Sequence, residues 1–285
     1  MPLAQPAGAA ATRTPVSVMI FTLNEAIHLP SCLAALAWCD DVIVVDSFST
    51  DTTETITREA GARFFQHAFT GFGDQRNWAL ANCSPCHEWI LILDADERVT
   101  PELVDEMATR LASAPADVAA FRIKRRFYFW GQWLKYSSLY PTWVVRLIHR
   151  DRVHYINRGH AETQVVNGNT LAMTNDLIDE NMKGIDEWFE RQNRYSSKDA
   201  EYELQTSGKP IAWGALVTGD NLGRRATLKQ IAARMPLRPL VYFLYSYVFR
   251  LGFLDGMNGF HFCVMKALYQ RMVLIKKYDM SKRVP

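Results

Sequence analysis

The sequence predicts an α/β fold built on a doubly wound, mostly parallel sheet, followed by a helical C-terminal segment. In the first hundred residues, short apolar runs alternate with stretches that carry helix signals. The runs are apolar throughout instead of at every second residue, which is typical of strands that are covered on both faces in a parallel sheet. Residues 221–285 differ from the rest in charge and apolarity, and they predict the separate helical segment.

We expect the strands at the apolar runs and the helices between them. The runs are 16–22 (VSVMIFT), 42–46 (VIVVD), 63–65 (RFF) and 89–94 (WILILD). Pro30 suits a first helical position, Asp51 can cap the next helix, a third helix runs through Trp78, and Thr100 before a proline opens a fourth. This alternation predicts a βαβαβαβ order.

Further elements follow residue 118. The stretch 119–133 predicts a strand and an aromatic loop, 144–150 another strand, and 186–205 an amphipathic helix. We therefore place the α/β domain at 15–220 and the helical segment at 221–285.

Composition places the chain among ordinary globular proteins. Of its 285 residues, 48% are apolar and 22% charged, which excludes a disordered or fibrous chain. Residues 1–14 hold one Arg and no continuous apolar run, so we expect a disordered tail and no secretory signal. The five cysteines are an odd number, which favours a reducing cytosol over a disulfide framework.

The C-terminal segment is strongly basic. Residues 221–285 hold 12 Lys and Arg against 2 Asp and Glu, whereas the remainder holds 20 against 28. The apolar run 239–249 is too short to span a bilayer. After it, a stripe recurs at helical spacing: Met257, His261, Val264, Leu268, Met272 and Ile275. Basic, aromatic-rich amphipathic helices lie in the membrane interface, so we expect an anionic membrane surface as a partner and no nucleic acid. Two ordinary packing helices are the alternative.

Carboxylates cluster at one predicted sheet edge. Asp46 and Asp94 end the second and fourth strands, and the carboxyl ends of parallel strands are where such sheets bind ligands. Asp96 follows two residues after Asp94, and such a pair can share a divalent cation, Mg²⁺ or Mn²⁺, with a diphosphate. In the alternative interpretation, Asp96 and Glu97 only begin a turn before the next helix.

In combination these elements resemble family 2 glycosyltransferases, which have the GT-A fold. The matching segments are 17–36, 42–53, 71–80 and 89–97. The remainder is similar, more loosely, to the bacterial membrane-peripheral branch that extends lipopolysaccharide core, exopolysaccharide or other lipid-linked glycans. The resemblance implies an inverting transferase at the cytoplasmic face of the inner membrane. We expect it to move glucose from UDP-glucose to a lipid-linked glycan acceptor.

The processive members of this family carry a QxxRW motif, of which residues 192–195 are only a faint echo. We therefore expect one sugar to be added per acceptor encounter.

The resemblance also implies a nucleotide-sugar site. Its residues would be Thr22, Asn24, Glu25, Asp46, Arg76, Asn77, Asp94 and Ala95. Glu25 would lie near the ribose hydroxyls and Asp46 would accept the N–H of a uracil ring. Arg76 would reach the diphosphate and Asn77 the sugar-nucleotide loop. Alternatively, the loop after the first strand only caps a helix.

The metal would be held by Asp96, with Asp94 as a second ligand that also faces the sugar or ribose. Inverting transfer needs a base for the acceptor hydroxyl. Glu162 is the leading candidate, with Asp179 and Glu180 in reserve, although Glu162 can also be read as a surface acid. The candidates for acceptor or membrane contact are Trp133, Arg146, His160, Tyr242, Phe243 and Arg250.

Three rival classes of protein fit the sequence less well. Residues 83–87 (CSPCH) match a haem c attachment pattern, but that chemistry requires export, and no export signal is visible. A sugar-phosphate nucleotidyltransferase shares the sheet but needs a glycine-rich loop after the first strand, and residues 22–30 contain no glycine. A non-catalytic membrane-binding module leaves the clustered carboxylates unexplained.

Overall fold

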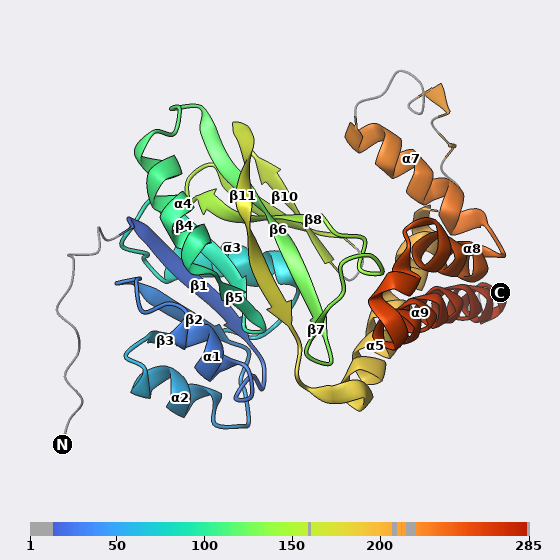
Figure 1. The fold of residues 1–285 in the computed structure, drawn as a ribbon, viewed down its shortest axis with the longest axis horizontal. Coiled ribbons are helices and arrows are strands. Elements are labelled where there is room, and N and C mark those ends of the chain that lie inside the picture. Colours follow the sequence, from blue (N-terminus) through green and yellow to red (C-terminus); the bar gives the residue numbers. More distant parts are fainter. Residues whose placement is uncertain (1–13, 159–160, 207–209, 212, 215–220, 284–285) are drawn as a thin grey trace.

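The computed structural model joins an α/β sheet to a cluster of helices (Figure 1). It describes residues 14–158, 161–206, 210–211, 213–214 and 221–283. The predicted tail at 1–14 therefore lies, apart from Thr14, outside the described residues, and so does His160.

Nine strands form one mixed sheet, and two more form a separate antiparallel pair, β9 with β10. The strands are β1 Val16–Thr22, β2 Val42–Asp46, β3 Arg63–Gln66, β4 Trp89–Asp94, β5 Glu97–Val99, β6 Val118–Phe129, β7 Gln132–Trp133, β8 Thr142–His149, β9 Val153–Arg158, β10 Ala161–Val166 and β11 Asn169–Glu180. Their order across the sheet is β3-β2-β1-β4-β8-β6-β11-β5, with β7 paired to β6.

The sheet is parallel from β3 to β4, as predicted. Beyond β4 it is mixed, because β8 inserts antiparallel between β4 and β6, and β5 pairs antiparallel with β11. The α/β class is confirmed, and the sheet is mixed but largely parallel, since β6 and β11 also pair in parallel.

The first four helices lie where the sequence signals predict them. Their bounds are α1 Leu29–Ala34, α2 Thr53–Glu59, α3 Phe72–Asn82, α4 Pro101–Ala112, α5 Gly184–Thr206, α7 Asn221–Arg234, α8 Arg238–Leu244 and α9 Gly256–Arg283, with a π-helical turn at Tyr245–Phe249 and a 3₁₀ turn at Gly252–Asp255. Thr100 caps α4, since its hydroxyl accepts the N–H of Leu103 at 3.3 Å. Asp51 accepts the N–H of Thr53, the first residue of α2, at 3.0 Å.

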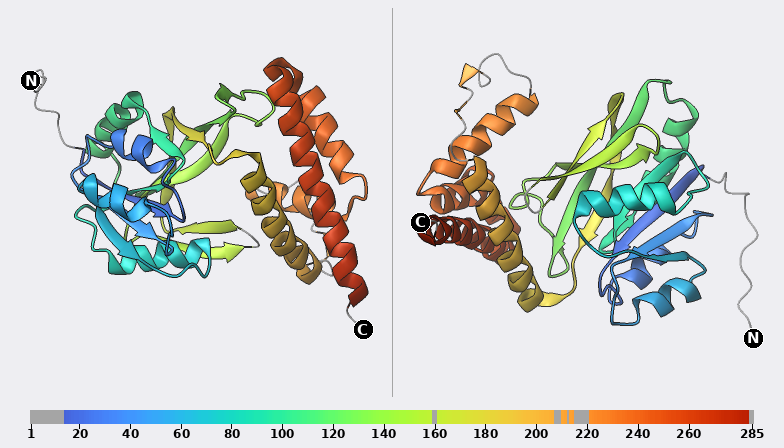
Figure 2. Two further views of the ribbon diagram at one scale, coloured as in Figure 1. Left: turned by 90° about the horizontal axis from the view of Figure 1, so that it is seen from below. Right: turned by 180° about the vertical axis from the view of Figure 1, so that it is seen from behind.

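Two apolar layers enclose the central strands, which explains the uninterrupted apolar runs. Alternate residues of β1 point to opposite faces, so Val18 packs in a layer with Leu103 of α4, and Met19 in a layer with Ala79 of α3. All seven residues of β1 are buried. Helices therefore cover the sheet on both faces (Figure 2).

The helical cluster contains α5, α8 and α9, which pack against one another beside the sheet (Figure 1). A buried carboxylate fastens it to the sheet. Asp255 accepts hydrogen bonds of 2.7–3.1 Å from the backbone N–H groups of Lys135, Tyr136 and Ser137 and from the Ser137 hydroxyl. These bonds fix the start of α9 next to the connection between β7 and β8.

Helix α9 exposes apolar side chains in addition to those on its buried face. Its buried face is formed by Phe262, Cys263, Met265, Tyr269 and Val273. In the predicted apolar stripe, by contrast, Met257, Leu268 and Ile275 are exposed. Within the described residues, no helix is long and apolar enough to cross a membrane.

Candidate functional site

A cleft of about 460 Å³ opens at the carboxyl edge of the sheet, where β1 and β4 end opposite α5. From the predicted site, it is lined by Thr22, Glu25, Asp94, Ala95 and Asp96. These residues come from loops that are about 70 positions apart in the chain, and parallel pairing of β1 with β4 brings them together. The structure thus brings polar side chains together at this edge of the sheet, as predicted.

Asp94 is held between two guanidinium groups. One carboxylate oxygen accepts a hydrogen bond from Arg76 at 3.1 Å, and the other accepts one from Arg146. Burial opposes ionisation of Asp94, but the charges of Arg146 and Arg76 more than offset it and lower the pKa of this carboxyl to about 2. Asp94 is therefore an anion at neutral pH, and both of its oxygens are engaged.

We call Asp94, Arg76 and Arg146 the ion cluster. Arg146 is buried within it and does not lie at an acceptor-facing surface. It is only 5% exposed, and it also donates to Glu97 at 2.6 Å. Glu97 is itself buried, which raises its pKa, and Arg125 stands 3.6 Å from it. The expectation that Arg146 meets the acceptor is thus replaced by a role in holding two buried carboxylates.

The metal ligands predicted from the sequence fit only in part. The Asp94 oxygens are taken by arginines, so the structure does not present Asp94 as a ligand. Asp96 lines the cleft, and one of its oxygens accepts from the Asn181 amide at 3.1 Å. Within the described residues, no three His, Cys, Asp or Glu side chains gather as a metal site. One carboxylate plus substrate phosphates is a binding mode that Mg²⁺ uses, and Asp96 fits it.

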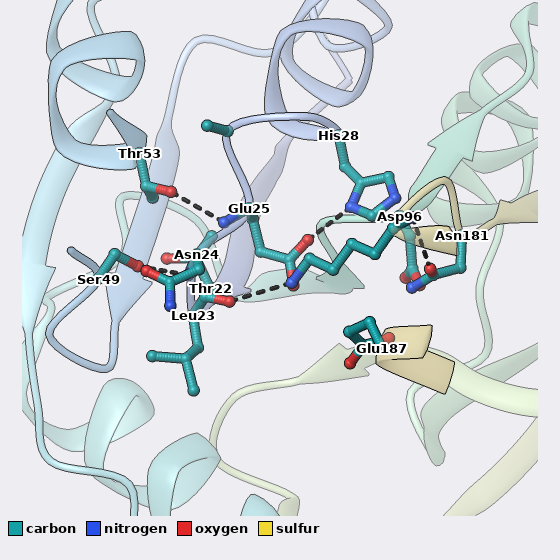
Figure 3. A network of polar contacts seen from close by, with 12 residues as sticks. Thr22, Leu23, Asn24, Glu25, His28, Ser49, Thr53, Asp96, Asn181 and Glu187 are labelled. Atoms are coloured by element: carbon teal, nitrogen blue, oxygen red, sulfur yellow. Dashed lines mark hydrogen bonds and ion pairs between the residues drawn. The ribbon is translucent and has the colours of Figure 1, made fainter. Parts of the chain in front are cut away.

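The loop after β1 is tied to the segment that leads from β11 into α5 (Figure 3). Glu25 pairs with Lys183 at 2.6 Å through one oxygen and with the His28 ring at 2.6 Å through the other. The second ring nitrogen of His28 accepts the backbone N–H of Met182 at 2.7 Å. Glu25 thus lies at the cleft, with its carboxylate held by one side chain from its own loop, His28, and one from a distant segment, Lys183.

Asn24 organises the neighbouring loop instead of lining the cleft. Its φ is 55°, and its side-chain oxygen accepts the N–H of Thr50 at 2.8 Å. Its own N–H donates to the Ser49 hydroxyl at 2.7 Å (Figure 3). Asn is one of the residue types that tolerate this left-handed conformation.

Asp46 and Asn77 also hold the scaffold. Asp46 is buried and accepts hydrogen bonds from the Thr22 hydroxyl at 2.8 Å and from both the N–H and hydroxyl of Ser49. The Asn77 amide makes two bonds with the backbone of Tyr155, at 2.8 and 2.9 Å, which join α3 to β9. Neither side chain is among those that line the cleft, and their roles toward a nucleotide stay predictions.

Glu162, the predicted base, reaches the ion cluster from β10. Its carboxylate lies 3.4 Å from Arg76, whose guanidinium is 2% exposed and also contacts Asp94. The guanidinium of Arg76 further lies over the rings of Phe21 and Phe72. Arg76 therefore links Glu162 with Asp94, and Glu162 is more than a surface acid.

A second cavity, of about 410 Å³, lies between the ends of β6 and β11 and the helices α5, α8 and α9. Asp179 lines it, 2.9 Å from Arg125. Burial raises the pKa of Asp179 to about 7, despite the opposing charge of Arg125. Arg191 lines both this cavity and the first cleft, so the two spaces adjoin at that side chain.

Sequence reasoning missed the contribution of α5 to the first cleft. Arg191, Arg194 and Lys198 all line it, together with Tyr195. Their spacing of three, four and seven residues puts them on one helix face, and this periodicity was available as a signal. Only the tertiary structure shows that this face of α5 lies opposite the edge of the sheet.

The remaining predicted contacts lie away from the cleft. Trp133 packs against Tyr140 and lies near Arg126, while Arg250 donates to the Tyr140 carbonyl at 3.0 Å. Tyr242 lines the second cavity, and Phe243 packs on Tyr247 and Phe260.

Comparison with known proteins identifies the family. Residues 17–172 match the model of Glycosyl transferase family 2. The lipopolysaccharide core biosynthesis glycosyltransferase LpsC of Rhizobium meliloti is 28% identical over 275 residues, which cover 94% of this chain and 93% of LpsC. An uncharacterized glycosyltransferase of Rickettsia felis is 37% identical over 111 residues, 38% of each chain. S. aureus TarS in complex with UDP-GlcNAc superposes with a TM-score of 0.47 at 16% identity, covering 94% of this chain and 91% of that one. Because the family match spans more than half of its residues, this chain belongs to glycosyltransferase family 2.

Proposed function

We propose that this protein is an inverting, metal-dependent transferase that moves glucose from UDP-glucose to a lipid-linked glycan of the lipopolysaccharide type, one sugar per encounter. The observation that carries the proposal is the pair of adjoining cavities, one beside Asp94 and Asp96 and the other beside Asp179. A transferase needs separate spaces for donor and acceptor that meet at the reacting atoms. The similarity to LpsC along nearly the whole chain supports a lipopolysaccharide acceptor.

In the first cleft, the donor diphosphate would face the basic side of α5. Arg194 and Lys198 line the cleft opposite Asp96, and arginine is well suited to bidentate phosphate recognition. A divalent cation, when bound at Asp96, would offset the charge that develops on the departing UDP. Glu25 would receive the ribose hydroxyls in place of its contact with Lys183.

In the second cavity, Asp179 is our candidate for the base. A base works best when its pKa lies near the working pH, and the pKa of Asp179 is raised to about 7. The acceptor hydroxyl gives its proton to the Asp179 carboxylate. The acceptor oxygen bonds to the anomeric carbon on the face opposite UDP, while the bond from that carbon to UDP breaks and UDP leaves.

Glu162, the base favoured by the sequence, keeps a supporting role in this proposal. Its carboxylate is engaged with Arg76 and therefore helps to position the arginine that holds Asp94. The two assignments are separable, because only the base sets the pH dependence of transfer.

We also propose that the helical cluster lies on the cytoplasmic face of the bacterial inner membrane. Large apolar side chains are exposed along α8 and the turns that follow it: Leu237, Leu240, Val241, Leu244, Tyr245, Val248, Phe249, Leu251, Phe253, Leu254 and Met257. So many exposed large apolar side chains in one short stretch of chain favour contact with a lipid surface, and the segment that carries them is strongly basic. Tyr242 and Phe243 are half-buried, so their neighbours would make the lipid contact.

A thermal-shift screen of nucleotide sugars with and without Mn²⁺ tests the proposal. A ligand that binds only the folded state raises the unfolding temperature. We expect UDP-glucose with Mn²⁺ to give the largest rise, and an Asp96→Asn variant to lose the metal-dependent part. A folded protein that responds to no nucleotide sugar would contradict the proposal.

A further inference from the structure

The second cavity carries a cation that neither the ion cluster nor the proposed chemistry uses. Lys266 of α9 lines this cavity, and its ammonium lies 5.9 Å from the ring centres of both Phe262 and Tyr269. Across the part of the chain that the structure describes, no carboxylate lies within ion-pair distance of Lys266. Among the described residues, the carboxylate whose charge acts on Lys266 is that of Asp199, which already accepts the Tyr269 hydroxyl at 2.6 Å.

The other charged groups of the cavity are matched. Asp179 lies 2.9 Å from Arg125, and Glu180 lies 2.5 Å from Arg98. Arg191, the remaining cation of the lining, has Glu187 at 3.7 Å. Each acid thus has its own guanidinium partner, and Lys266 leaves the cavity with a surplus of positive charge.

The walls of the cavity are aromatic. They are formed by Phe127, Phe129, Trp130, Trp188, Tyr242 and Phe262. Aromatic faces pack well against the C–H faces of sugar rings and also tolerate a nearby cation. The combination of these walls with a single unmatched ammonium is selective for a ring that carries a negative charge.

We infer that this cavity binds an acceptor sugar that bears an anionic group, a phosphate or a carboxylate, and that Lys266 is the partner of that group. This inference rests on the proposed function, since it places the acceptor in the cavity that Asp179 lines. Burial, together with the charges of Arg125 and Arg191, lowers the pKa of Lys266 against the opposing charge of Asp199, so the unliganded ammonium is in an unfavourable place. An incoming anion would relieve that cost, whereas a neutral sugar would not.

The test compares monosaccharide probes on the full chain by titration calorimetry, with saturating UDP present to occupy the donor cleft. The probes are glucose 6-phosphate, glucuronic acid, methyl glucoside and inorganic phosphate. We expect at least one anionic sugar to bind about tenfold or more tightly than methyl glucoside, the gain typical of one charge-assisted hydrogen bond. The tighter of the two anionic sugars identifies the group.

Variants assign that preference to Lys266. Lys266→Met keeps the apolar stem and should abolish the preference, whereas Lys266→Arg should retain it. Lys282→Met, which removes the same charge from an exposed position of α9, should behave as the wild type. UDP binding is the readout that Lys266→Met should leave unchanged, and the unfolding temperature of this variant should not fall, because the substitution removes a buried charge.

Several results would overturn the inference. They are equal binding of neutral and anionic sugars, a preference that survives in Lys266→Met, or inorganic phosphate that binds as tightly as glucose 6-phosphate. Loss of binding to phosphatidylglycerol vesicles in Lys266→Met, with sugar binding intact, would assign the lysine to a lipid headgroup instead. Failure of UDP itself to bind would count against the proposed function, and the same sugar titrations without UDP would still decide the role of Lys266.

Discussion

Replacing Asp179 by asparagine should remove the pH dependence of sugar transfer around neutrality. The pKa of Asp179 is raised to about 7, so the ionised fraction of a base with this pKa rises from about one tenth at pH 6 to about nine tenths at pH 8. The wild-type kcat/KM should therefore climb about tenfold over this interval. Asparagine has the same shape but accepts no proton, so the residual rate should be about 10²- to 10⁴-fold lower and flat with pH.

The assay is the initial rate of UDP release at low acceptor concentration, measured across this pH range. Glu180→Gln is the matched control, because Glu180 is the adjacent acid and is bound to Arg98. It should keep the rise in rate. If the rise disappears in Glu162→Gln and persists in Asp179→Asn, Glu162 is the base and the reasoning from the pKa of Asp179 is refuted.

The same pKa predicts a stability effect of defined sign. The folded state holds a proton on Asp179 up to about pH 7, whereas the unfolded chain loses it near the ordinary value of 3.8. Stability contributed by this group is therefore present at low pH and is lost as the pH rises from about 4 to about 7. Asp179→Asn should show a smaller fall in unfolding temperature across that window than the wild type, and an equal fall would count against the raised pKa.

Three further outcomes are expected. Arg146→Met should lower stability by about 3–5 kcal/mol, because it leaves Glu97 buried beside a more distant arginine; thermal unfolding measures this, and an unchanged midpoint would contradict it. Asp96→Asn should make UDP binding insensitive to Mn²⁺ in calorimetry, so EDTA should weaken binding to the wild type only. Phe249→Ser, at a side chain that is 77% exposed, should weaken flotation with phosphatidylglycerol vesicles by about tenfold or more without changing transfer to a water-soluble acceptor; equal flotation would exclude this surface from lipid binding.

The strands that could be predicted residue by residue are those buried on both faces. β1, β2 and β4 have the predicted bounds, because both of their faces are covered and most of their residues must be apolar, which makes each strand an almost continuous apolar run. β11 was missed, since its polar residues alternate irregularly and its pairing with β6 shifts register. Its partner β5 has three residues, too few for any periodicity to appear.

The candidate site divides in the same way. Thr22, Asp94 and Asp96 were predictable because the end of a parallel strand fixes where the following side chain lies. The bond from Arg146 to Asp94 was not, because it joins residues 52 positions apart and no local pattern encodes it. For Asp46, the sequence predicted its position at a strand end, but it did not predict the hydrogen bonds by which this buried carboxylate holds the loop at Ser49.

The charges around Asp94 explain how a cleft that contains acidic residues can receive a donor with two phosphates. A carboxylate facing a diphosphate would repel it, but Arg76 and Arg146 each bond one oxygen of Asp94 and together offset its charge. Asp96 then remains as the acid of this motif that can accept a cation, and a cation placed there attracts the phosphates. The two aspartates thus have different environments: the first is locked to arginines from α3 and β8, and the second faces the cleft. We infer that donor binding depends on this asymmetry, because a cleft with both carboxylates unmatched would favour a metal but repel its nucleotide.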